Sequence, residues 1–305
     1  MKAMAGERHR PGIQCLRNAR PPRKVLHMSL QALSASVALW LTLCGPALAQ
    51  DNDPDASPIW QKVRADLFGG TRIESGEQML MLETPRRAED AAIVPVAVRA
   101  RFPQAANRYI DKLWLIVDNN PSPIAAVFHF TPDSGRADIE TRIRVEQYTH
   151  VRAIVRVDDG KLYMVANYVK ASGGCSAPAS KDAAASRATL GKMRFRVDDP
   201  LIPNRPALVQ LMISHPNDSG LAMDQLTRTY AAPHFVRSVE VRYDGTPLLS
   251  AEVDFSISEN PNFRFFFIPG QGGELEAKAT DNQDQEFTAR LKLDSQRVGA
   301  VATPH

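Results

Sequence analysis

The sequence predicts an all-β protein in which two β-sandwiches follow one another along the chain. Most of the chain alternates apolar and polar residues with a period of two, in short segments. Turn signals such as Asn-Asn, Asp-Ser-Gly and Asp-Asp-Gly separate these segments at regular intervals. A polar, Ala/Ser-rich stretch at residues 171–191 then divides the alternating segments into two sets of similar size. Short, regularly spaced strands of this kind are typical of a sandwich.

Residues 1–49 have the organisation of a secretory signal peptide. A basic stretch ends at Lys24, an apolar run covers Met28 to Leu43, and Ala47-Leu48-Ala49 provides small residues before Gln50. The apolar run is too short and too rich in Ser for a transmembrane helix. We therefore expect cleavage after Ala49, export to the periplasm, and no membrane attachment of the mature protein.

Three alternatives for this leader stay open. It could be retained as an N-terminal anchor, or the true start could be Met28. Cys44 could be a lipid attachment site, although Leu43 stands where lipoprotein signals place a small residue.

The net charge of +3 comes from the leader. Residues 1–49 hold seven Lys and Arg residues against one acid, which leaves the remainder of the chain with 30 basic and 33 acidic residues. The mature chain is therefore slightly acidic, and its charge gives no reason to expect nucleic-acid binding.

The first expected element of the mature chain is a helix over residues 58–70. Ser57 can cap its first turn, and Pro58 suits the first helical position. Apolar residues recur at helical spacing, namely Ile59, Trp60, Val63, Leu67 and Phe68. A short N-terminal helix should therefore precede the strands.

The strands of the first sandwich, which we assign to residues 58–170 together with the helix, follow in order. They are expected at residues 93–101, 112–117, 125–130, 139–148, 151–157 and 162–169.

The second sandwich is expected at residues 192–295, followed by a tail at residues 296–305. Its strands are predicted at residues 193–197, 208–213, 235–243, 248–257, 263–268, 275–280 and 287–293. Residues 171–191 contain too few apolar side chains to offset the entropy of ordering them, so we expect a flexible linker there.

Cleavage of the leader removes Cys15 and Cys44 and leaves Cys175 as the one cysteine of the mature chain. An internal disulfide is then excluded. The segment 170–181 has no large apolar side chain, and it contains two Gly residues and a Pro. We expect the Cys175 thiol to be exposed on a mobile arm, where it could also form a disulfide dimer. The alternative is an ordinary buried cysteine.

The search for a conventional active site is negative. The five His residues after the leader follow no metal-binding spacing, and no P-loop, GxSxG or dinucleotide fingerprint occurs. His215-Pro216 ends a strand and is expected to cap a turn. We therefore expect no catalytic residues, no bound metal and no cofactor.

Two sets of motifs resemble a known pair of proteins. The first half contains Arg87-Ala88-Glu89-Asp90-Ala91-Ala92, Leu115-Ile116-Val117-Asp118-Asn119-Asn120-Pro121 and Ser172-Gly173-Gly174-Cys175, and it resembles SoxY, the sulfur-substrate carrier of periplasmic thiosulfate oxidation. The second half contains Ile213-Ser214-His215-Pro216, Ser219-Gly220 and Phe255-Ser256-Ile257-Ser258-Glu259-Asn260-Pro261, and it resembles the partner SoxZ. The whole chain is most similar to fused SoxYZ-like carriers associated with quinoprotein dehydrogenases.

This resemblance implies two immunoglobulin-like sandwiches and a non-catalytic carrier. It implies that Cys175 is the covalent attachment point for a sulfur intermediate, held as a thiosulfonate or persulfide. Gly173 and Gly174 would form the flexible approach, with Ser172 and Ser176 completing the carrier arm. The chain departs from the family because Ser176-Ala177-Pro178 and a further domain follow the Cys, whereas the family's arm ends the chain in Gly-Gly-Cys-Gly-Gly.

Three classes of function stay open. In the first, the protein carries sulfur intermediates on Cys175 for periplasmic oxidoreductases or sulfur-processing enzymes, among them a quinoprotein dehydrogenase. In the second, it is an accessory module of such a dehydrogenase without sulfur carriage. In the third, it is a thiol enzyme or redox sensor, which is disfavoured because no base adjoins Cys175 in the sequence and no second cysteine remains to resolve a disulfide.

Overall fold

A computed structural model describes residues 53–178, 188–198, 200–223 and 227–294. The predicted signal peptide, residues 179–187 of the expected linker and the tail lie outside these residues, so the expectations for them stay predictions. All described residues belong to one compact unit. No helix among them has the length and apolar character needed to cross a bilayer.

The chain enters the fold through a short 3-10 turn, η1 (Pro54–Ala56), and the helix α2 (Pro58–Phe68). The Trp60 amide donates to the Ser57 hydroxyl at 3.2 Å, so Ser57 caps the helix as its sequence position predicts. The helix ends at Gly69, whose φ of 56° favours glycine.

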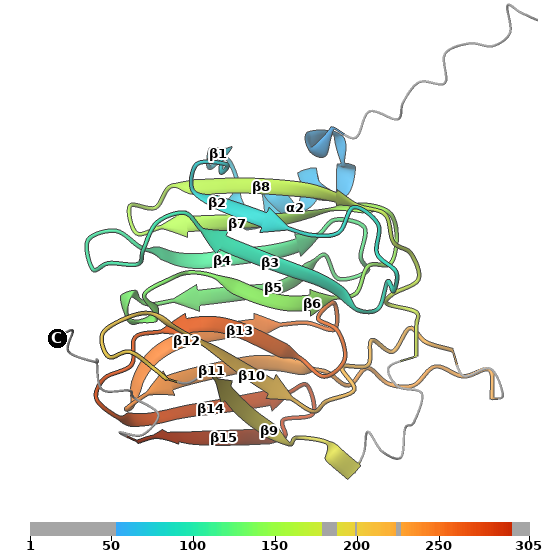
Figure 1. The fold of residues 1–305 in the computed structure, drawn as a ribbon. Coiled ribbons are helices and arrows are strands. Elements are labelled where there is room, and N and C mark those ends of the chain that lie inside the picture. The colour runs from blue at the N-terminus through green and yellow to red at the C-terminus, as the bar shows by residue number, and fades with distance from the viewer. Residues whose placement is uncertain (1–52, 179–187, 199, 224–226, 295–305) are drawn as a thin grey trace, which may run out of the picture. The chain divides into compact units, whose positions relative to one another are not determined.

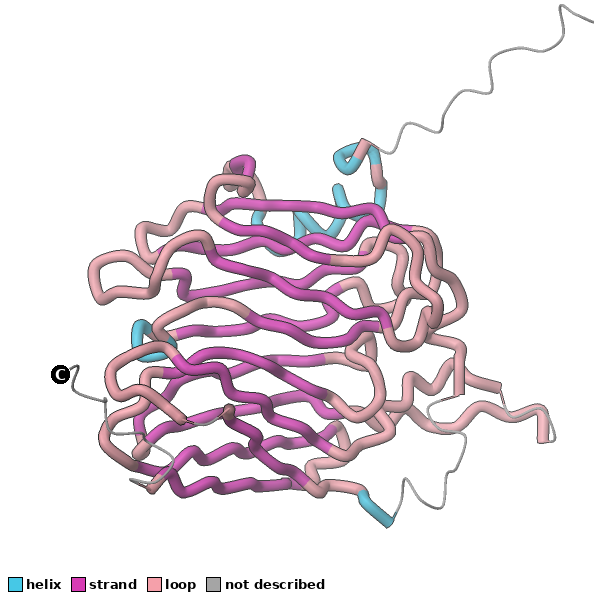
Figure 2. Tube along the Cα trace, viewed as in Figure 1, coloured by secondary structure: helices cyan, strands magenta, loops and turns pink. Residues whose placement is uncertain are grey.

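Fifteen strands follow among the described residues, eight in the first half and seven in the second (Figures 1 and 2). The first eight are β1 (Ile73–Ser75), β2 (Leu80–Glu83), β3 (Val94–Ala100), β4 (Ile110–Val117), β5 (Ile124–Phe130), β6 (Ile139–Ile143), β7 (Thr149–Val157) and β8 (Leu162–Val169). The 3-10 turn η2 (Pro132–Ser134) connects β5 to β6.

The second half contributes β9 (Met193–Val197), β10 (Ala207–Ile213), β11 (Val236–Tyr243), β12 (Thr246–Val253), β13 (Asn262–Phe267), β14 (Gly273–Asp281) and β15 (Glu286–Leu293). The all-β class is confirmed. Two short strands, β1 and β2, were not predicted, and the strand expected at residues 139–148 ends at Ile143.

Both halves build the same two sheets. The larger sheet has nine strands in the order β1-β8-β7-β4-β5-β12-β11-β14-β15, and the smaller has six in the order β2-β3-β6-β13-β10-β9. The halves meet where β5 pairs antiparallel with β12 and where β6 pairs with β13. Figure 1 shows these strands side by side at the middle of the fold. Main-chain hydrogen bonds therefore join the two halves in both sheets.

The main core lies between the two sheets and is also shared. Phe128 on β5 packs edge-on against Phe263 on β13, with ring centroids 5.9 Å apart. Both rings are fully buried. Burying two such rings against each other adds the quadrupole attraction of an edge-to-face pair to their hydrophobic contribution. The interface between the halves thus has the character of a protein core.

A second, smaller core lies on the other face of the nine-stranded sheet, beneath α2. Trp114 on β4 contacts Phe68 of the helix edge-on, with centroids 5.0 Å apart. Leu113 and Leu115 of the same strand belong to the main core. The strand is buried on both faces, and this explains why it reads as a continuous apolar run.

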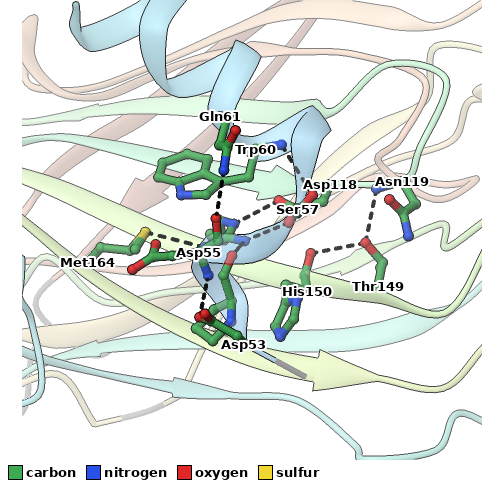
Figure 3. Close-up of polar contacts among 12 residues, drawn as sticks. Asp53, Asp55, Ser57, Trp60, Gln61, Asp118, Asn119, Thr149, His150 and Met164 are labelled. Atoms are coloured by element: carbon green, nitrogen blue, oxygen red, sulfur yellow. Dashed lines mark hydrogen bonds and ion pairs between the residues drawn. The ribbon is translucent and has the colours of Figure 1, made fainter. Parts of the chain in front are cut away.

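A buried arginine fixes α2 to this face. The Arg152 guanidinium donates to both Asp118 carboxylate oxygens, at 2.7 and 2.6 Å, and lies 4.3 Å from the centre of the Trp60 ring. It also donates to the Pro54 carbonyl. Figure 3 shows Trp60 and Asp118 beside the capped start of the helix. Because the pair is buried, bidentate and stacked on an aromatic ring, it specifies where the helix docks.

The shared sheets predict the outcome of cutting the chain between the halves. A protease site inserted between Ala183 and Ala184 should yield two fragments that still co-elute on size exclusion, because the β5–β12 and β6–β13 pairs and the Phe128–Phe263 contact do not depend on the connection. Fragments that separate at micromolar concentration would contradict this interface.

Candidate functional site

The segment that carries Cys175 is docked against the sandwich. The Gly173 amide donates to the Glu146 carbonyl at 2.9 Å, and the Gly174 amide donates to the Val145 carbonyl at 3.0 Å. Cys175 is 0% exposed. The expectation of an exposed thiol on a mobile arm is therefore wrong for residues 171–178. The physical reason is that main-chain hydrogen bonds hold a segment whose side chains are too small to do so.

Gly174 allows this docking because there is no room for a side chain. A Cβ atom at this position would lie 2.0 Å from the Ala91 carbonyl oxygen and 2.7 Å from the Val145 nitrogen. Gly173 differs, because its φ of 81° favours glycine while no atom crowds it. Gly174 thus permits close contact with the main chain of Ala91 and Val145, and Gly173 permits the turn that precedes it.

The Glu146 carboxylate caps the turn at Cys175. It accepts the Cys175 amide at 2.8 Å and the Ser176 amide at 3.1 Å, and the Ser176 hydroxyl donates to it at 3.1 Å. Ser172, at the start of the segment, is exposed. Of the predicted arm residues, Gly173, Gly174 and Ser176 therefore make contacts that determine the position of Cys175.

The second half of the chain holds the same segment from the other side. The Ser219 hydroxyl donates to the Cys175 carbonyl. Arg144 spans both halves: its guanidinium donates to the Gly174 carbonyl at 3.1 Å and to the Asn217 carbonyl at 3.3 Å. The docked cysteine is therefore a feature of the joined halves.

Burial controls the chemistry of the thiol. Burial, with a smaller contribution from the Glu146 carboxylate, raises the pKa of Cys175 to about 12, and the Arg144 guanidinium opposes this rise. The thiol is therefore protonated at neutral pH. Because the thiolate is the nucleophile, the docked cysteine is unreactive.

A cluster of three titratable side chains lies further along the same network. The Asn217 amide donates to His215 Nδ1 at 3.0 Å, which is a turn-capping contact. His215 Nε2 faces Asp281 Oδ2 at 3.6 Å, and His234 Nε2 lies 2.8 Å from the same oxygen. No sequence pattern indicates that these three side chains meet, because they come from three separate segments.

This cluster has the residue types of a metal site, and its ligand atoms lie within 4.8 Å of one another. The hydrogen bond to His215 Nδ1 does not fit that role. An imidazole that accepts at Nδ1 carries its proton on Nε2, whereas a metal ligand needs a free lone pair there. Burial and the neighbouring His234 also lower the pKa of His215 to about 4. We assign the cluster as a buried hydrogen-bonding group around Asp281, with His215 neutral.

A cavity among the described residues lies elsewhere. It has a volume of about 740 Å³ and is lined by β2, β3, β6, β10 and β13, including Arg99, Arg142 and Arg264. The Glu140 carboxylate forms ion pairs with Arg99 and Arg264 there. Cys175 does not line this cavity, so the cavity and the thiol are separate features.

Comparisons with protein families divide the chain into the same two halves as its sequence pattern. Residues 64–175 match the model of the sulfur oxidation protein SoxY, and residues 199–292 match that of the sulphur oxidation protein SoxZ. The first match ends at Cys175. No curated protein matches the chain.

Solved structures similar to the chain include the sulfur carrier protein SoxY from Chlorobium limicola f thiosulfatophilum, with 25% identity over 37% of this chain and 90% of that one and a TM-score of 0.31. Superoxide reductase (neelaredoxin) from Ignicoccus hospitalis is 16% identical over 36% of this chain and 85% of its own, with a TM-score of 0.26. A beta-glycosidase from Bacteroides vulgatus is 8% identical over 70% of this chain and 24% of its own, with a TM-score of 0.23.

The tight contact at Gly174 predicts a release of the segment on mutation. Gly174→Ala should expose Cys175 and raise its rate of alkylation by iodoacetamide at pH 8 by at least about tenfold, because the Cβ atom collides with main-chain atoms that cannot move aside. Gly70→Ala is the matched control, since nothing lies within 4 Å of a Cβ there. Equal alkylation rates in both variants would show that the segment is not docked in solution.

The raised pKa of Cys175 predicts a specific loss of stability in alkali. Below pH 9 the thiol is protonated in both folded and unfolded chains, whereas between pH 9 and 12 only the unfolded chain loses the proton. Relative to Cys175→Ser, the free energy of unfolding should fall by about 1.4 kcal/mol per pH unit in that window. Denaturant titrations at pH 8 and 10.5 measure this. Parallel behaviour of the two proteins would mean that the thiol titrates normally.

Proposed function

We propose that this chain, a fused SoxYZ-like protein in which a SoxY domain precedes a SoxZ domain, is a non-catalytic carrier that holds a sulfur intermediate on Cys175. The observation that carries the proposal is the position of this residue. The SoxY match ends at Cys175, and it is the one cysteine of the chain after the leader. The Glu146 carboxylate beside it is occupied by the amides of Cys175 and Ser176.

The chemistry of loading explains why a carrier needs partners. Joining thiosulfate to the Cys175 thiol forms one S–S bond and releases one proton and two electrons. The chain has to pass these electrons to an oxidoreductase, and a quinoprotein dehydrogenase is one candidate. Hydrolysis of the terminal sulfonate then consumes one water, yields sulfate and a proton, and leaves a persulfide on Cys175. A separate hydrolase is the partner for that step.

Carriage requires the Cys175 segment to leave its docked position. In the docked state the pKa of about 12 keeps the thiol protonated, whereas a released cysteine ionises near its ordinary value of 9.0. Release breaks the hydrogen bonds of the segment to Glu146, Arg144 and Ser219. It removes no large apolar side chain from the core, because the segment has none. Each contributes on the order of 1 kcal/mol, so binding of a partner enzyme supplies enough free energy to shift this equilibrium. The periplasm is the location that we propose for this cycle.

The burial of Cys175 also favours a second candidate function. A thiol that stays docked cannot exchange sulfur groups, and the protein would then act as an accessory module of a periplasmic dehydrogenase without covalent carriage. The Ser-Ala-Pro sequence after Cys175 is a departure from the family pattern that is consistent with this alternative.

Intact mass separates the two functions. Protein recovered from its host grown on thiosulfate should carry adducts of sulfur or thiosulfate mass that dithiothreitol removes, because a carrier is loaded during turnover. Cys175→Ser should carry none. An unmodified thiol under all growth conditions would reject carriage and support the accessory module.

Disulfide dimers through Cys175 are expected on non-reducing gels only for chains in which the segment is released, because the docked thiol is inaccessible.

A further inference from the structure

The guanidinium of Arg144 is buried beside Cys175 without an anionic partner. Arg144 is 1% exposed, and its two described contacts at the guanidinium are to neutral carbonyls, those of Gly174 and Asn217. Its Nε–H has no hydrogen-bond partner among the described residues. Glu259, Asp218 and Asp90 act on it electrostatically, but no ion pair joins it to any of the described carboxylates.

Such an arrangement is costly unless the charge is used. A buried cation normally has a hydrogen-bonded anion beside it, because removal from water otherwise destabilises the fold. Arg152 in the same chain shows the usual solution, since its guanidinium is equally buried and is paired with Asp118. Arg144 differs in lacking that partner.

We propose that Arg144 is the binding residue for an anionic group attached to Cys175, so that the docked segment preferentially holds a negatively charged adduct. This inference rests on the proposed carrier function. A thiosulfonate ends in a sulfonate, which is anionic throughout the physiological pH range and accepts hydrogen bonds from a guanidinium. Its charge would meet the unpartnered Nε–H of Arg144.

The charges around Cys175 set this preference. The free thiol in the docked segment is protonated and offers Arg144 no charge. Of the acids that act on Cys175, Glu146 is occupied by the amides of Cys175 and Ser176, and burial raises the pKa of Asp254. No described carboxylate forms an ion pair with Arg144, so the adduct supplies an anion that this guanidinium can bind directly. Docking is therefore tighter for an anionic adduct than for a neutral one.

Two chemically installed adducts test the preference. Tetrathionate converts the Cys175 thiolate to the thiosulfonate and releases thiosulfate, whereas methyl methanethiosulfonate produces a neutral methyl disulfide. The measured quantity is the rate at which dithiothreitol releases each adduct, followed by intact mass. A synthetic peptide of residues 171–178 with the same adduct provides the unprotected rate for each group.

In the wild-type chain we expect the thiosulfonate to be protected at least about tenfold more than the methyl disulfide, the effect of one hydrogen bond between charged groups. Arg144→Gln should abolish that difference, while Arg144→Lys should retain part of it. Arg156→Gln is the matched control, because Arg156 pairs with Asp111 away from the segment and its loss should change neither rate.

Several outcomes would overturn the inference. Equal protection of both adducts in the wild-type chain would show that the docked segment does not select charge. Equal loss of protection for both adducts in Arg144→Gln would show that Arg144 only supports the fold. Because the adducts are installed chemically, these outcomes leave the carrier function itself intact, which fails separately if no adduct forms in the host.

Discussion

The structure depends on the pairing of strands β5 and β12, with β6 and β13 paired in the opposite sheet. These pairs turn two sandwich halves into one two-sheet fold, and the Phe128–Phe263 contact then becomes part of a shared core. The same pairing brings Asn217 and Ser219 of the second half next to the segment that ends the first. Neither half has these contacts alone.

A line of buried polar groups follows from this arrangement. It runs from the Gly174 carbonyl, next to Cys175, through Arg144 and Asn217 to His215 and Asp281, and it joins segments that are distant in sequence. Buried polar groups rarely add much net stability, but they penalise every alternative packing that leaves them unpaired. The network therefore fixes one relative position of the two halves, which a purely apolar interface of similar size would specify less strictly.

Local patterns in the sequence were sufficient for the elements and insufficient for the site. The period-two alternation predicted most strands, and Ser57 and Pro58 predicted the start of α2, because these signals depend on near neighbours. The sequence did not indicate the burial of Cys175, because small side chains and two glycines occur both in mobile loops and in closely packed segments. Only the positions of Ala91 and Val145 show that Gly174 serves close contact.

Arg144 could not be singled out for a related reason. It lies in the predicted strand at residues 139–148, where arginine alternates with apolar residues, so it reads as an ordinary surface charge. Its burial results from the second half covering the end of β6, and that contact is visible only in the fold. The His215, His234 and Asp281 cluster was hidden in the same way. The sequence held one signal for these second-half residues: His215 and Ser219 belong to motifs that resemble SoxZ.

The docked state of Cys175 has a consequence for oxidative damage. Peroxides attack the thiolate and drive cysteine through sulfenic to sulfinic acid, which would permanently destroy an attachment point. With a pKa of about 12, the docked thiol stays protonated at pH 7 and offers no thiolate to a peroxide. In the proposed carrier cycle, a chain between two turnovers is thus shielded by acid–base chemistry as well as by burial. In that cycle the thiol is open to oxidation only while the segment is released and carries no adduct.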